Sequence, residues 1–454
     1  MTTTTHRTGA TSARIPLSGT QQWWCADDLG DDVGAFSPQF TSQVAVRVAG
    51  QVDTSALQAA LDDLVERHEI LRTIVTRDAE PRYQTVHPPS AATLVVRDVE
   101  PSERERDVVV QEIITREGRQ EVDLRRLPLL RAGLNRFDED DSVLVLTSHH
   151  TMADGWSMHV LMRDLAVLYK HRCTGVLDHL PEPAQYQDFV SWEQARIAGP
   201  EAVRTLTYWR EKLAGGRIFS LPSSRPVSGP YSRPYSALFF SVDPDVTSEV
   251  LRVSRASVFM VLLAAFNVLA HEIDGTDDPV VNTFSSGRHD PRTRDIVGSI
   301  VNTLPLRTTL AGSPTFREVV TRTRRTCLEA FDHEVPTSYI DQEAPRLWDG
   351  TEDPWRCNFF AFNMPQSHVD DTDLDFADGA TEVRKGAVEK ESESMDLADG
   401  VVWAMDLLDT GELTGTLRFN VEEFDEDVVS GWVASYQRIL TAGVQDPERD
   451  WTTL

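Results

Sequence analysis

The chain has 454 residues, 40% of them hydrophobic, and a formal net charge of -28 at pH 7. This length predicts one large or two moderate domains. Such acidity argues against a nucleic-acid partner, because phosphate binding requires a basic surface. The lack of any run of about 18 apolar residues argues against a membrane span.

Neither a secretion signal nor a disulfide framework is expected. Residues 1–14 are polar and rich in threonine, without the apolar segment of a signal peptide. The four cysteines, Cys25, Cys173, Cys327 and Cys357, lie far apart and lack metal-binding spacing. We therefore expect reduced thiols in a cytoplasmic protein.

Hydrophobic patterning predicts alternating strands and helices in the first part of the chain. Segment 44–48 favours a strand, a leucine-patterned helix capped near Asp53 or Thr54 follows, and 71–75 returns as a strand. The apolar run 143–146 predicts a buried strand. The leucines after it recur at i, i+4 and i+7, which predicts an amphipathic helix.

A similar order returns further along. Segment 237–242 reads as a strand, 259–266 lies in a nearly all-apolar and hence buried helix, and 280–283 is a strand again. Strands alternating with helices predict α/β layers. The repeated order predicts two related lobes, which we divide as 1–180 and 181–454 because 179–183 is a short connector containing two prolines.

The last part of the chain begins with an acidic stretch, 366–395, which we expect to be a mobile loop. Segments 401–405 and 413–419 then predict a hairpin around the turn at 409–412. A final helix at about 426–440 closes the chain.

The most informative stretch is 149–157, which reads HHTMADGWS. It places His149 and His150 where the buried strand stops and Asp154 and Gly155 where the helix starts. A zinc site is one interpretation, although adjacent histidines at a strand end point to opposite faces. Buried structural histidines are a second. The third is a general base, since the pKa of histidine lies close to working pH.

Further motifs follow one another along the chain. They are Ser18 with Gln21, 67–73 (RHEILRT), 149–157, 186–192 (YQDFVSW), Gly287 with Arg288, 297–307 (VGSIVNTLPLR) and 333–336 (HEVP). In this order and spacing they resemble the condensation domains of nonribosomal peptide synthetases, over nearly the whole chain. Each motif alone is weak, but the ordered set is highly specific.

The resemblance implies two lobes like chloramphenicol acetyltransferase, arranged as a V-shaped pseudo-dimer with a central tunnel. It implies that His150 is the functional histidine and that His149 is structural. It also implies that Asp154 holds the loop through a salt bridge, with Arg288 as the first candidate partner and Arg72 as the second.

The sequence departs from the family pattern in two places. The family usually has arginine and then an aromatic residue after the glutamine of the first motif, whereas here Gln21 is followed by QWWC. The late motif is reduced to 355–363 (WRCNFFAFN). Ser18, Asn302 and Asn363 are candidates for the substrate tunnel, with an ordinary turn or strand residue as the alternative for Asn363.

The pair of histidines and the lack of an EGHGRE motif separate the chain from cyclising and epimerising relatives. With no adenylation or carrier segment, it resembles free-standing condensation enzymes, which tailor polyketide, enediyne or siderophore scaffolds. We expect a monomer that takes an acyl or aminoacyl group from the phosphopantetheine of a carrier protein and passes it to a hydroxyl or amine of a small molecule. No bound cofactor or metal is expected. An acyl-CoA-dependent acyltransferase and a non-catalytic carrier-docking module remain as alternatives.

The expected mechanism follows from the thioester, which is already activated. The protein then has to supply positioning and proton handling. His150 takes the proton of the attacking group. Backbone N–H groups near Gly155 stabilise the oxyanion.

Overall fold

The structure is a computed structural model. It describes residues 14–26, 28, 30–32, 34–38, 40–225, 235–252, 257–348, 359–363, 376, 379–382, 401–408 and 410–454. The chain divides into two compact units. Unit 1 comprises Met1–Ala195, Arg288–Ile300 and Ser367–Gly386, and unit 2 comprises Arg196–Gly287, Val301–Gln366 and Ala387–Leu454.

This division differs from the expected one at residue 180. Helix α5 (Tyr186–Ile197) begins beyond that point, yet Tyr186 and Val190 are buried in the core of unit 1. Segment 288–300 also belongs to unit 1, because Ile296, Val297 and Ile300 join the same core. Local hydrophobic patterning does not predict that these later segments pack into unit 1, since each placement depends on contacts between residues far apart in the sequence.

Unit 1 is built on a five-stranded sheet in the order β12-β2-β7-β6-β5. The strands are β2 (Thr41–Ala49), β5 (Thr93–Asp98), β6 (Leu130–Arg136), β7 (Asp141–His149) and β12 (Gly379–Glu382). Only β5 and β6 run parallel among these pairs. Strand β7 is central and buried from its second residue onward, which explains its continuous apolar run.

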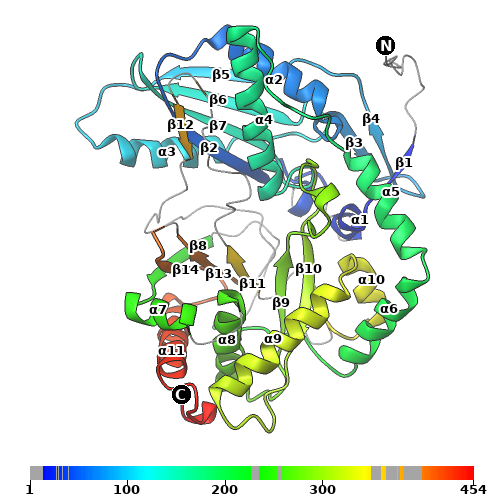
Figure 1. Ribbon diagram of the computed structural model, residues 1–454, viewed down its shortest axis with the longest axis vertical. Helices are drawn as coiled ribbons and strands as arrows, with labels where there is room; N and C mark the ends of the chain where they lie inside the picture. Colours follow the sequence, from blue (N-terminus) through cyan, green and yellow to red (C-terminus); the bar gives the residue numbers. More distant parts are fainter. Residues whose placement is uncertain are drawn as a thin grey trace. The chain divides into compact units, whose positions relative to one another are not determined.

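Helices cover both faces of this sheet (Figure 1). Leu144 and Leu146 pack with α2 (Thr54–Arg67) and α4 (Gly155–Thr174). Val143 and Val145, which alternate with them, pack with α3 (Arg106–Gly118) on the other face. The predicted cap is confirmed, because the Asp53 carboxylate accepts from the N–H groups of Ser55 and Ala56.

A second, small sheet joins β1 (Ile15–Pro16), β4 (Tyr83–Val86) and β3 (Thr73–Thr76). The strand expected at 71–75 therefore starts two residues late. Leu71 belongs to the 3-10 helix η2 (Glu69–Arg72), where its N–H donates to the carbonyl of His68 and its side chain is fully buried. Helix α1 (Gly19–Ala26) and the short turns η1 (Gly34–Phe36) and η3 (Pro291–Thr293) complete unit 1.

Unit 2 is built on a six-stranded mixed sheet in the order β10-β9-β11-β13-β14-β8. The strands are β8 (Tyr235–Ser241), β9 (Val280–Ser285), β10 (Asn302–Arg307), β11 (Phe359–Asn363), β13 (Val401–Leu407) and β14 (Leu413–Asn420). The helices are α6 (Glu201–Lys212), α7 (Pro244–Arg252), α8 (Val258–Asp274), α9 (Phe316–Asp332), α10 (Thr337–Glu343), α11 (Glu426–Gln445) and the short η4 (Trp451–Thr453).

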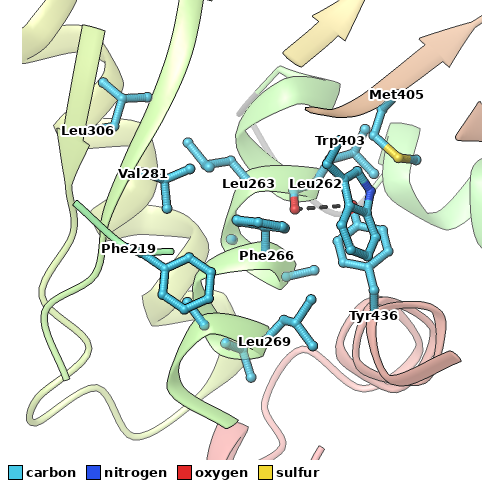
Figure 2. Close-up of a cluster of buried hydrophobic side chains, with 14 of the residues drawn as sticks. Phe219, Leu262, Leu263, Phe266, Leu269, Val281, Leu306, Trp403, Met405 and Tyr436 are labelled. Carbon is cyan, nitrogen blue, oxygen red and sulfur yellow. Dashed lines mark hydrogen bonds between the residues drawn. The ribbon is translucent and has the colours of Figure 1, made fainter. Parts of the chain in front are cut away.

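The core of unit 2 surrounds α8, whose residues from Met260 to Ala270 are all buried. Figure 2 shows Phe266 of this helix facing Trp403, with ring centroids 5.4 Å apart. The hydroxyl of Tyr436 donates to the carbonyl of Leu262 at 3.2 Å, so α11 is fixed to α8 by a polar bond inside an apolar core. The predicted buried helix is confirmed.

In the last part of the chain, some of the predicted elements are confirmed and others differ from the structure. The predicted hairpin is confirmed by β13 and β14, which pair from Val401↔Phe419 to Leu407↔Leu413. The final helix is longer than expected, ending at Gln445. Most of 366–395 lies outside the described residues, but the loop expectation is wrong for Gly379–Glu382, which pairs with β2 as a strand.

Two expectations about the whole chain bear on function. Among the described residues, no helix is long and apolar enough to cross a membrane. Cys25, Cys173 and Cys327 are free thiols, and Cys357 lies outside the described part. The α/β class predicted from the alternating elements is confirmed in both units.

Candidate active site

The histidine pair lies where central strand β7 leaves the sheet of unit 1. Strand pairing places His149 opposite Thr41 of β2, and the N–H of His150 donates to the carbonyl of Phe40 at 2.8 Å. The N–H groups of Met152 and Ala153 then turn back to the carbonyl of His149. The loop is thus fixed by backbone bonds on both sides before α4 begins.

His149 is a buried structural residue. Its Nε2 donates to the carbonyl of Ser37 at 2.9 Å, which leaves Nδ1 to accept from the Thr151 hydroxyl at 2.8 Å. Burial lowers the pKa of His149 to about 3. Both ring nitrogens are therefore engaged, and the imidazole is neutral at working pH.

His150 is partly exposed and stacks on an aromatic ring. Its imidazole lies 4.8 Å from the ring of Phe40 at 17°, and the ring of Trp24 lies edge-on to it at 6.1 Å. Among the described residues, Nδ1 is buried without a hydrogen-bond partner outside its own residue. Burial lowers the pKa of His150, although its own backbone and the charge of Asp154 oppose this. The arrangement leaves a neutral imidazole with Nδ1 turned toward its own backbone.

Asp154 caps the N-terminus of α4 and is almost fully buried. Its Oδ1 accepts from the N–H of Ser157 at 2.8 Å and from the Ser157 hydroxyl at 2.6 Å. Its Oδ2 accepts from the N–H of Ile300 at 3.0 Å. Burial would raise the pKa of this carboxyl, but Arg288 and these donors together lower it.

Arg288 lies against Asp154, as the first of the two candidate partners. Its Nη2 is 2.9 Å from Oδ1 and 3.1 Å from Oδ2, and its side chain is fully buried. The same guanidinium donates to the backbone carbonyls of Thr293, Ile296 and Gly298. Arg288 therefore holds the 288–300 segment against the start of α4.

The second candidate partner, Arg72, is placed elsewhere, which corrects that alternative. It donates to the carbonyl of His87 at 2.6 Å and pairs with Glu69 at 3.8 Å, because η2 directs it along its own turn. Gly155 is exposed as the first residue of α4, and open space lies where a Cβ would stand.

Ser18 is a capping residue inside unit 1. Its N–H and hydroxyl exchange two hydrogen bonds with Gln21, a capping box at the start of α1. The Ser18 hydroxyl donates to Tyr186 at 2.7 Å, and Tyr186 donates to the carbonyl of Ser299 at 2.9 Å. This chain joins three of the sequence motifs and is buried throughout. These bonds give Ser18 a structural role in unit 1, and its place in the substrate tunnel stays a prediction.

Asn302 and Asn363 both lie in unit 2. The Asn302 amide donates to Glu334 at 3.0 Å and its carbonyl accepts from the N–H of Thr337 at 3.0 Å, so it fixes the turn before α10. Asn363 ends β11 beside Asp406 of β13. Asn363 is thus a strand residue, and its side chain lies outside the described part; the place of Asn302 and Asn363 in the substrate tunnel stays a prediction.

The zinc interpretation finds no support in the contacts of this loop. Both nitrogens of His149 and both oxygens of Asp154 are already hydrogen-bonded. No group of three or more His, Cys, Asp or Glu residues in the described part of the chain could hold a metal ion.

Two aromatic residues at His150 were not predicted as part of the site. Phe40 precedes β2 and Trp24 lies on α1, and neither position carries a local signal of contact with the histidine. In the sequence, the tryptophan pair is marked only as a departure from the family pattern. Ser157, three residues after Asp154, follows the spacing of a helix cap and could have been predicted.

Sequence comparison places these observations in a family. The family model described as a condensation domain matches residues 12–454. The chain is 37% identical over 71% of its length to a linear gramicidin synthase of Brevibacillus parabrevis, and 30% identical over 95% to chondramide synthase cmdD of Chondromyces crocatus. It spans only 4% and 11% of the lengths of those two proteins.

Solved structures agree with this. SgcC5 of Streptomyces globisporus, crystallised with (R)-(-)-1-(2-naphthyl)-1,2-ethanediol and sucrose, is 36% identical with a TM-score of 0.87, over 96% of this chain and 100% of that one. The X-domain from teicoplanin biosynthesis is 26% identical with a TM-score of 0.79, over 98% of each chain. The predicted condensation-domain fold, α/β in both units, is confirmed, and the chain belongs to the condensation domain family.

Proposed function

We propose that this protein transfers an acyl or aminoacyl group from the phosphopantetheine thioester of a carrier protein to a hydroxyl or amine of a small molecule, in natural-product biosynthesis. The observation that carries the proposal is the contrast between the two histidines. Both nitrogens of His149 are hydrogen-bonded, whereas His150 is partly exposed and its Nδ1 is buried. We therefore assign Nε2 of His150 as the basic atom. A neutral, positioned imidazole is suited to general-base catalysis.

The reaction balances without a cofactor. His150 Nε2 takes the proton of the acceptor hydroxyl or amine while the acceptor atom forms a bond to the thioester carbonyl carbon. The tetrahedral intermediate collapses, the C–S bond breaks, and the imidazolium returns the proton to the pantetheine sulfur. Backbone N–H groups at the N-terminus of α4, beginning at Gly155, are the groups we assign to the oxyanion.

Asp154 has a supporting role in this proposal. Its lowered pKa keeps it ionised, and its oxygens accept from Ser157, Arg288 and Ile300. An ionised, fully engaged carboxylate does not shuttle protons at neutral pH. It fixes the helix start and hence the loop that carries His150.

A hydroxyl acceptor is supported by the similarity to SgcC5. That protein, 36% identical to this chain, was crystallised with an aryl 1,2-diol. A hydroxyl also depends more on a base than a neutral amine does, because the amine attacks without prior loss of its proton. We therefore place ester formation first and amide formation second.

A non-catalytic docking module is the second candidate. The teicoplanin X-domain, which is 26% identical over 98% of this chain, was also solved in complex with OxyB. A docking role would not explain the partly exposed imidazole of His150. Measured turnover therefore distinguishes the acyltransferase from the docking module. Transfer from acyl-CoA is a variant of the first candidate with another donor.

The test supplies one acyl group on a carrier protein and on CoA, with a panel of aryl diols and amines, and detects products by mass spectrometry. We expect acylated acceptor with a higher kcat/KM from the carrier-bound donor, because binding energy of the remote carrier helps to orient the thioester. Equal or better use of acyl-CoA would contradict the carrier donor. Absence of product from both donors, with carrier binding retained, would favour the docking module.

A further inference from the structure

The orientation of the His150 ring needs an explanation. An imidazole turns about two side-chain bonds, so the direction of Nε2 depends on what contacts the ring. Catalytic histidines are commonly oriented by a carboxylate or a carbonyl of another residue on Nδ1. Among the described residues, Nδ1 of His150 has no such partner. The carboxylate of Asp154 binds Arg288 instead.

Phe40 contacts His150 twice. Its carbonyl accepts the His150 N–H at 2.8 Å, which fixes the backbone, and its ring stacks on the imidazole at 4.8 Å and 17°. The same ring meets His149 edge-on at 6.1 Å and 69°. Phe40 is in turn placed by the start of β2, where Thr41 pairs with His149.

Trp24 fixes Phe40 and His150 from α1. Its ring lies edge-on to Phe40 at 5.3 Å and 68°, and edge-on to His150 at 6.1 Å and 64°. Trp24 is buried, and it packs against Trp23 at 4.7 Å. The three rings of Trp24, Phe40 and His150 therefore contact one another pairwise, and such edge and stacked contacts are geometrically selective.

We propose that Phe40 and Trp24 are positioning residues, whose rings hold the His150 imidazole in the orientation that keeps Nδ1 buried and leaves Nε2 as the base. The proposal rests on the proposed function of His150. It adds that aromatic packing orients the imidazole here, whereas in other sites a hydrogen-bonded side chain orients it. Neither residue touches the substrate in this scheme.

The first test follows the tautomer of His150 in the full-length protein by long-range 15N–1H NMR, with its signals assigned from His150→Gln among the 12 histidines. We expect one tautomer in the parent chain and in Phe40→Tyr, which keeps the ring. Phe40→Leu should show a mixture. Phe36→Leu is the matched control, because Phe36 is buried in the same segment and its ring contacts Arg77.

The second test uses kinetics with the carrier-bound donor. Phe40→Leu should lower kcat at least about tenfold while KM changes less than about threefold, since only the orientation of the base is lost. Phe40→Tyr should recover kcat to within about threefold of the parent, and Phe36→Leu should match the parent. If Phe40→Leu does not fold, Phe40→Met fills the space without a ring and takes its place.

A single tautomer in Phe40→Leu, with kcat equal to that of Phe36→Leu, would overturn the proposal. So would an equal loss in both variants, which would indicate a general packing effect. Full turnover in His150→Gln would instead overturn the proposed function. The tautomer measurement would still decide what holds the ring, because it needs no substrate.

Discussion

Arg288 and Asp154 form a buried ion pair, 2.9 Å from Nη2 to Oδ1, between residues 134 positions apart in the chain. The pair fastens the 288–300 segment to the N-terminus of α4, directly after the loop that carries His150. Arginine suits this place because it stays charged when buried and its several N–H groups reach several acceptors.

Breaking this pair should destabilise the protein strongly. Arg288→Met or Asp154→Asn alone leaves buried polar groups without their partner, which we expect to cost about 3–5 kcal/mol for the charged case. The double variant should lose clearly less unfolding free energy than the two single variants lose together, because the two residues contact each other. Urea unfolding of all four proteins measures this. Arg292→Met, which breaks an exposed pair with Asp290, is the control and should cost at most about 1 kcal/mol. Full additivity would show that the pair is not coupled.

Stability should also depend on His149 at mildly acidic pH. Burial lowers its folded pKa to about 3 from 6.5, so between these values the unfolded chain binds a proton that the folded chain does not. The contribution of neutral, buried His149 to the free energy of unfolding is fully present above pH 6.5 and decreases as pH falls toward 3. Between pH 7 and pH 5 this loss amounts to about 2 kcal/mol.

His149→Gln should remove that part of the pH dependence, because an amide does not titrate. The exposed residue His179 provides the control variant, His179→Gln, which should keep the dependence of the parent. Unfolding free energies at pH 5, 6, 7 and 8 decide the matter. An unchanged slope in His149→Gln would mean that His149 is not the buried neutral group described.

Two glycines near the site should respond oppositely to alanine. A Cβ on Gly298 would lie 2.0 Å from Tyr186, whereas a Cβ on Gly155 would meet nothing within 4 Å. We expect Gly298→Ala to lose about 1–3 kcal/mol through overpacking, and Gly155→Ala to melt like the parent. Thermal melting compares them. Equal melting temperatures of the two variants would contradict the close packing of Gly298 against Tyr186.

The sequence predicts the candidate site residues but not the contacts that hold them in place. The apolar run before His149, the cap at Asp53 and the buried helix α8 follow from local patterns, and all three are present. The stacking of Phe40 on His150 depends on the register of β2 against β7, which no local pattern encodes.

The same limit explains the missed boundary and the missed strand. Segment 288–300 joins unit 1 through Arg288, and Gly379–Glu382 joins the sheet through β2. Both partners lie more than 100 residues away in the chain, so only long-range packing decides these placements. An acidic composition around 379 favours a loop locally, and strand pairing overrides it.

The pH dependence of catalysis should follow His150. Burial lowers the pKa of this imidazole, so it stays in its neutral, basic form at pH values below 6.5. The acid limb of kcat/KM should therefore have its midpoint below 6.5, the ordinary value for histidine. A profile measured with a carrier-bound donor checks this. A midpoint above 6.5 would mean that another group controls the rate.

In the proposed reaction His150 is the base and His149 is not. The most direct measurement is single-turnover acyl transfer from a carrier-bound donor by the parent, His150→Gln and His149→Gln, each with its melting temperature. We predict that His150→Gln keeps the fold and slows transfer by about 10²–10⁴-fold. His149→Gln should change the melting temperature more than it changes the rate. A loss of less than about tenfold in folded His150→Gln would contradict the role of His150 as the base.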